Sequence, residues 1–241
     1  MAITSAPQRG GRSAHHGLLI SIAALIAALA LAMIGVALLV HGGGSSNSGV
    51  QGSGIAATQT RNVATFSSLD LAGSNSVTVM VGAPQSVVVH ADTNLISHVT
   101  TQVVGGTLVI GDTGNFTARA PMSVEVGVPS LTALNLSGEG QISVTGINAP
   151  QLTVTVSGSG QLSAAGTAAR LDVTLSGDGE AQLGQLVAQD VHAVISGSGL
   201  IQVTAMSSLD AAVPGDGSIV YSGNPSQVNT SVTGTGTVTR G

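Results

Sequence analysis

The sequence predicts an all-β protein: a single-stranded right-handed parallel β-helix with coils of 18–20 residues, preceded by one N-terminal transmembrane helix. Two observations predict the β-helix. A short Gly-x-Gly phrase recurs at a fixed period, and aliphatic residues alternate with polar ones between its copies. A third observation, a long uncharged segment near the amino terminus, predicts the membrane helix.

The phrase is a small residue followed by Gly-x-Gly, and it occurs six times, each copy starting 18 to 20 residues after the previous one. The copies are Ser137–Gly140, Ser157–Gly160, Ser176–Gly179, Ser196–Gly199, Pro214–Gly217 and Thr233–Gly236. A fixed period this short indicates a solenoid, in which each coil buries its apolar face by stacking on its neighbours. We interpret the glycines as corners, where a positive φ would favour glycine.

The residues between the phrases alternate with the period of a strand that has one buried face. Leu152, Val154 and Val156 lead up to one phrase, and the same spacing leads up to the following copies. A second short run, such as Ile142 and Val144, follows each of the first five copies. Each coil should therefore contribute two inward segments, stacked about 4.8 Å apart. The right hand is expected because parallel crossovers are right-handed in most proteins.

The amino-terminal segment of residues 18–40 contains 23 residues without a formal charge. As a helix it would be about 35 Å long, enough to cross a bilayer core of about 30 Å. Arg9 and Arg12 precede it and the next arginine is Arg61, which predicts an uncleaved signal anchor with residues 1–17 as a cytoplasmic tail. The expected location is the inner (cytoplasmic) membrane, with the carboxyl-terminal domain periplasmic or extracellular. A cleaved signal peptide is the alternative, although the run is long and no Ala-x-Ala exit follows it.

The remaining chain divides by composition. Residues 41–62 are rich in Gly and Ser and predict a flexible linker. Residues 63–241 form the predicted β-helix, with an irregular cap and first coils at 63–130 and six regular coils at 131–241. Phe66 and Phe116 are expected to plug the open end of the core. Arg240 occupies an inward position of the last coil, so the apolar ladder should stop there, and its charge should discourage pairing with another chain.

Composition and charge limit the chemistry. The chain has no Cys and no Lys, and beyond residue 62 three arginines stand against eleven acidic residues, a formal charge of −8. Such a surface argues against binding nucleic acid or a polyanionic sugar. No acid/base constellation stands out either, so no catalytic residues and no cofactor are predicted, and an enzyme is not expected. A carbohydrate-active β-helix enzyme stays an alternative.

One polar column is a candidate site. Asp172, His192 and Asp210 should stack on consecutive coils, outside the core. Together they could raise the pKa of the histidine or hold a divalent cation. The preferred interpretation is a solvated polar face with a weak ion pair, so no metal site is predicted.

The sequence also resembles a known family. The stretch Phe66–Leu71, the strands at 77–81 and 87–91, the turn and strand Gly105–Ile110 and the serial Ser-Gly-Ser-Gly coils are similar to the auto-transporter adhesin head GIN domain of bacterial envelope proteins. The similarity covers residues 63–241. It implies a right-handed β-helix outside the cytoplasm with an adhesive role, and it supplies no catalytic residues.

These observations together predict a membrane-anchored, envelope-exposed module for binding or adhesion, without catalytic activity. Its expected partners are the membrane, through the N-terminal helix, and envelope glycans or proteins. The alternative is a structural or sensing module of the bacterial envelope. The oligomeric state is left open.

Overall fold

The structure, a computed structural model, describes residues 49–241. These residues form strands and turns and contain no helix, and hence none long and apolar enough to cross a membrane. The predicted tail (1–17) and membrane helix (18–40) lie outside the described residues.

Seventeen strands follow one another within residues 49–241. They are β1 (Val50–Gln51), β2 (Ala56–Thr60), β3 (Ser68–Leu71), β4 (Ser76–Val81), β5 (Ser86–Asp92), β6 (Val99–Val104), β7 (Thr107–Asp112), β8 (Phe116–Thr117), β9 (Ser123–Val128), β10 (Ala133–Leu136), β11 (Gln141–Val156), β12 (Gln161–Leu175), β13 (Glu180–Ile195), β14 (Leu200–Val213), β15 (Ser218–Ser222), β16 (Gln227–Val232) and β17 (Thr237–Arg240). Fifteen of them belong to one sheet, which is parallel from β10 to the carboxyl terminus.

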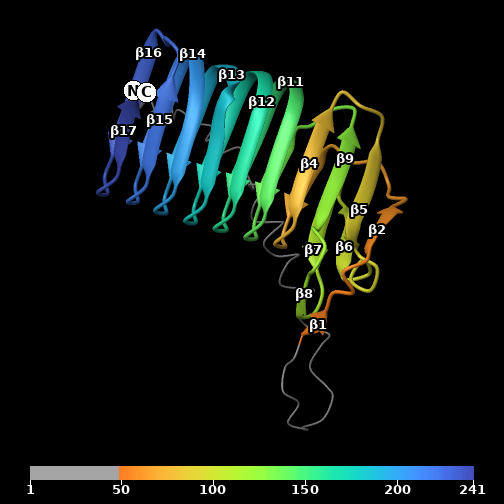
Figure 1. Ribbon diagram of the computed structural model, residues 1–241. Helices are drawn as coiled ribbons and strands as arrows, with labels where there is room; N and C mark the ends of the chain where they lie inside the picture. The colour runs from red at the N-terminus through yellow and green to blue at the C-terminus, as the bar shows by residue number, and fades with distance from the viewer. Residues whose placement is uncertain (1–48) are drawn as a thin grey trace, which may run out of the picture. The chain divides into compact units, whose positions relative to one another are not determined.

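The carboxyl-terminal part is a β-solenoid of about five turns, visible in Figure 1 as a row of parallel strands from β11 to β17. Each long strand starts after a Gly-x-Gly corner with a first segment, bends, and continues as a second segment to the next corner. In β11 the first segment pairs with β4 and the second with β10, while β12 pairs with both from the other side. The prediction of two inward segments per coil is confirmed. The right hand of the helix stays a prediction.

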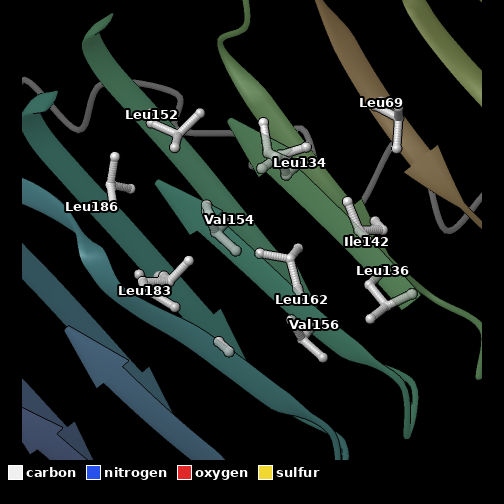
Figure 2. Packing of buried hydrophobic residues seen from close by; sticks show 14 of the residues in the cluster. Leu69, Leu134, Leu136, Ile142, Leu152, Val154, Val156, Leu162, Leu183 and Leu186 are labelled. Atoms are coloured by element: carbon white, nitrogen blue, oxygen red, sulfur yellow. The ribbon is translucent and has the colours of Figure 1, made fainter. Parts of the chain in front are cut away.

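The core consists of buried side chains in continuous files. Val154, Val173 and Ala193 lie in register on successive strands and are fully buried. Figure 2 shows the same arrangement for Leu134 beside Val154, from neighbouring strands. Because each file is apolar and the rungs are hydrogen-bonded, every coil removes its apolar surface from water only with its neighbours in place.

A further set of buried residues lies at the bend of each coil, between the two segments. These positions were not singled out from the sequence, because the alternation of apolar and polar residues breaks there. They include Ile147 of β11, Leu186 and Ala188 of β13 and Ala205 of β14. The core is therefore closed on the side of the bend as well as on the two faces.

The corner glycines have a different role from the one predicted. None of the phrase glycines has a positive φ; among the described residues that conformation occurs elsewhere, for example at Gly146 and Gly223 near the bends. Instead, a Cβ on Gly158 would collide with the carbonyl oxygen of Gly138 one rung away, and a Cβ on Gly177 with that of Gly158. Glycine is required because successive corners pack backbone against backbone.

At the amino-terminal end the order of strands in space differs from their order in the chain. β3 lies between β7 and β10, and β4 lies between β9 and β11. The chain therefore leaves the β3–β4 rung, builds the end of the domain, and returns to the other side of that rung. Antiparallel strands β2, β5 and β6 complete this end. Phe66 is buried in the core, whereas Phe116 stays outside it and lies beside His98, with ring centroids 5.5 Å apart and the ring planes tilted by 59°.

The ordered domain begins earlier than the linker boundary predicted at residue 62. Within the predicted linker, β1 pairs with β8 and β2 pairs with β5. The buried carboxylate of Asp92 holds this segment, because it accepts backbone N–H bonds from Gly54 (2.6 Å), Arg119 (2.9 Å) and Ala120 (3.1 Å). Burial alone would raise the pKa of Asp92, but these three donors and the charge of Arg119 outweigh it and lower the pKa.

Candidate functional site

The polar column predicted from the sequence is in register but is not one site. Asp172, His192 and Asp210 are successive partners on β12, β13 and β14. His192 Nδ1 lies 3.2 Å from an Asp210 carboxylate oxygen. Asp172 instead accepts hydrogen bonds from Arg170 (2.9 Å) and Gln151 (3.0 Å).

This column therefore consists of two separate surface pairs. Both lie at the solvent surface, with side chains between 23% and 63% exposed, and exposed ion pairs contribute only about 0–1 kcal/mol. Within residues 49–241 no group of three His, Cys, Asp or Glu side chains is arranged to hold a metal ion.

A second polar surface lies along the Gly-x-Gly corners, where it forms a solvent-open groove of about 430 Å³. Its floor is the backbone of the corner glycines Gly140, Gly160 and Gly179. Since glycine carries no side chain, the groove lies between two columns of polar side chains, and it extends over four rungs, because Ser74 and Ser76 of the β3–β4 rung also line it. We call it the corner groove.

One wall of the corner groove is formed by the variable residue of the phrase: Glu139, Ser159 and Asp178. The sequence shows the same column as an alternation of acids with small residues, which keeps like charges off adjacent rungs. The wall therefore presents two carboxylates two rungs apart, with a hydroxyl between them.

The opposite wall is a hydrogen-bonded ladder of side chains. Gln141 Nε2 donates to Gln161 Oε1 (3.0 Å), and Gln161 Nε2 donates to Glu180 Oε2 (3.1 Å). These residues occupy the same register position on β11, β12 and β13. Because every donor points in one direction and the last acceptor is a carboxylate, the ladder fixes the orientation of both amides.

The groove is strongly polar and acidic. Glu139, Asp178 and Glu180 line it together with glutamine amides and serine hydroxyls, and its lining among the described residues contains no basic or aromatic side chain. Such a surface can donate and accept hydrogen bonds to a polar ligand, and it repels polyanions.

Sequence reasoning missed this site although a signal was present. The position after the second glycine of the phrase reads Gln141, Gln161 and Glu180 in the first three coils and Leu200 in the fourth. The two columns flank a glycine corner, so only the fold shows that they face one another across it.

The fold and the groove define a capped β-solenoid with a polar surface site over its corners. The chain belongs to the family described as "Putative auto-transporter adhesin, head GIN domain", whose model matches residues 65–225. This match confirms the family membership that the sequence of residues 63–241 indicates. A search of curated proteins found no match.

Two crystal structures share the fold. A "putative adhesin" from Bacteroides fragilis is 23% identical with a TM-score of 0.67, over 80% of this chain and 100% of that chain. A "putative lipid binding protein" from Parabacteroides distasonis is 19% identical with a TM-score of 0.52, over 80% of this chain and 99% of that chain. At these identities the likeness extends to the fold alone.

Proposed function

We propose that the domain is an adhesion-like binding module, without catalytic activity, that holds a neutral or amino-bearing glycan in the corner groove. The observation that carries the proposal is the Gln141–Gln161–Glu180 ladder, because it holds amides in a fixed direction beside a glycine floor. The family, described as an adhesin head domain, supports the same reading.

The corner groove suits an extended ligand because the sequence repeat places similar side chains on successive rungs. Equivalent side chains recur on each rung at about 4.8 Å, so one chain can contact several rungs through similar hydrogen bonds. Sugar hydroxyls pair with both amides and carboxylates, while the acidic walls favour an ammonium group and disfavour sulfated or phosphorylated polymers. Binding should be shallow and individually weak, and repetition along the groove should strengthen it.

The test is binding of residues 47–241 to a glycan array, followed by titration of the best neutral or amino-bearing glycan. Gln161→Ala removes the middle of the ladder and should weaken binding about tenfold, the equivalent of one lost hydrogen bond with its partners disturbed. Gln202→Ala is the matched control, because Gln202 lies on the outer face of β14 away from the groove lining, and it should change binding less than about twofold.

Equal losses in Gln161→Ala and Gln202→Ala would place binding outside the corner groove. If the wild-type domain binds no glycan on the array, the structural or sensing role in the envelope is the better description.

We also propose that residues 18–40 anchor the chain in the inner (cytoplasmic) membrane, with residues 1–17 inside the cell and the β-solenoid on the periplasmic or extracellular side. The 23-residue uncharged run and the placement of Arg9 and Arg12 before it support this topology.

Protease treatment of intact spheroplasts tests the topology. An epitope tag fused at Gly241 should become accessible to the protease, while a tag fused before Met1 should stay protected. If protein in the membrane pellet retains the amino-terminal tag, the anchor has not been cleaved. A soluble chain without that tag would show cleavage and overturn the anchor.

A further inference from the structure

The last rung of the solenoid has two free strand edges. Within residues 49–241, β16 pairs only with β14, and β17 pairs only with β15. Each strand therefore has backbone N–H and C=O groups along one edge with no strand beside them, and an edge of this kind is a template for pairing with a further strand. At the opposite end, β2 and β6 also pair on one edge only, but they are antiparallel to their neighbours and do not continue the parallel rungs.

The side chains of this rung show that its core is unfinished. Val228 and Val232 of β16 are 41% and 44% exposed, although they continue files whose previous members, Leu209 and Val213, are 1% and 0% exposed. Exposing two inward valines costs free energy that a further rung would recover.

Electrostatics favours a second copy of this chain as the cover. The domain is acidic, so two copies repel one another over most of their surface. All eleven acidic residues lie at or before Asp216, so β16, β17 and their connecting corner contain no acidic side chain, and the nearest carboxylate, that of Asp216, accepts a hydrogen bond from Thr235. The terminal rung is therefore a place where two copies can approach with little repulsion between acidic side chains.

Arg240, whose charge is predicted to discourage pairing with another chain, makes contacts within its own chain. Its guanidinium is turned back to its own chain, where Nη2 donates to the carbonyl of Gly223 (2.7 Å) and to Asn224 Oδ1 (3.3 Å). The charge is thereby held at the bend of the coil.

The sequence of β16 is self-complementary in antiparallel register. With a two-fold axis at Thr230, Val228 lies opposite Val232 of the second copy on the core side, and Asn229 lies opposite Ser231 on the outer side. Thr230 meets its own equivalent, and Thr–Thr pairs across strands are favourable. If this two-fold axis is perpendicular to the layers that contain β16 and β17, it also places β17 of one copy beside β17 of the other. Both copies then use the same surface, as an isologous interface requires.

We infer that two copies of this chain associate end to end through their last rungs, with β16 antiparallel to β16 and centred on Thr230. The contact closes both cores and turns two solenoids into one continuous stack with a groove on each half. The inference rests on the fold alone and is independent of the ligand.

Cysteine cross-linking of the full chain tests the register, because the chain contains no cysteine of its own. Thr230→Cys should give a covalent dimer on mild oxidation, since directly opposite residues have Cβ atoms within about 5.5 Å. Asn229→Cys should cross-link poorly, because its equivalents lie on a diagonal of about 7–8 Å. Thr174→Cys, on the exposed outer face of β12, should give no dimer.

Analytical ultracentrifugation of the full chain measures the dimer dissociation constant directly. If the chain is found in the membrane fraction, it is first extracted with a mild detergent. Val228→Glu should raise the dimer dissociation constant at least tenfold, since it places a carboxylate against Val232 of the second copy. Circular dichroism of the same sample checks that the coil is folded.

Several outcomes overturn the inference. A wild-type chain that stays monomeric at about 0.1 mM excludes a specific contact of useful strength. Equal cross-linking of Thr230→Cys and Thr174→Cys indicates random collision. A Thr230→Cys chain that cross-links in cells to a different protein, and not to itself, assigns the edge to that partner.

Discussion

Gly158→Ala is expected to destabilise the solenoid by about 3 kcal/mol, near the upper end of the usual cost of overpacking. A Cβ at this corner would collide with the backbone oxygens of Gly138 and Ser137 on the neighbouring rung. Backbone cannot rotate out of the way as a side chain can, so the two corners must separate. Separation also weakens the rung bond from Gly158 N–H to the carbonyl of Leu136, which is already 3.3 Å long.

Gly184→Ala is the matched control, because Gly184 lies within β13 without a positive φ and a Cβ there would meet no atom within 4 Å. It should be neutral or stabilising by about 0.5 kcal/mol, through the reduced entropy of the unfolded chain. Urea unfolding of residues 47–241, followed by far-UV circular dichroism because the chain has no Trp, gives both values. Equal midpoints for the two variants would contradict the packing role of the corner glycines.

Leu171→Ala is expected to cost about 2–5 kcal/mol, the range for removing a buried leucine side chain. Leu171 is fully buried and continues the file of Leu152 and Val191 on the neighbouring strands. The cavity would lie between two rigid hydrogen-bonded rungs, which cannot collapse to fill it.

Leu200→Ala makes the same chemical change on the outer face of β14, where the side chain is only half buried, and should cost about 1 kcal/mol or less. The two variants are compared in the same urea titration, with a second probe such as limited proteolysis to detect unfolding of single coils. Similar losses for both would show that the inward file does not dominate the stability.

The regular coils could be predicted closely because their information is local. One phrase and one alternation determine which residues point inward, and the predicted stacking of inward residues is confirmed, for example at Val154, Val173 and Ala193. The register along Asp172, His192 and Asp210 follows from the same count. The rotamers that divide this column could not be predicted, because Arg170 competes for Asp172 through a contact within its own strand.

The amino-terminal end could not be predicted in the same way, because its contacts join distant parts of the chain. β2 has the sequence Ala-Ala-Thr-Gln-Thr, which shows no apolar alternation, and it becomes a strand by pairing with β5. Asp92 holds the neighbouring turn by hydrogen bonds to Gly54 and to Arg119 and Ala120. Composition alone therefore indicated a linker where tertiary contacts impose structure.

The corner groove was missed for a geometric reason. Its two walls are adjacent in sequence, so a pattern search treats each as a separate column. Asp178 and Glu180 line the same groove because the chain turns tightly between them. Gln141 and Gln161 form a hydrogen bond because their coils are stacked.

The position of β3 and β4 between strands that come later in the chain has a consequence for how the protein is made. As the polypeptide emerges from its amino terminus, residues 68–81 wait for partners up to about 65 residues downstream, so this region is the slow, long-range step. Once it has closed, each newly emerging coil finds its template about 20 residues behind it. The β3–β4 rung then acts as the nucleus on which the later coils add one after another. A mutation that prevents this rung from forming should therefore prevent all later coils from folding.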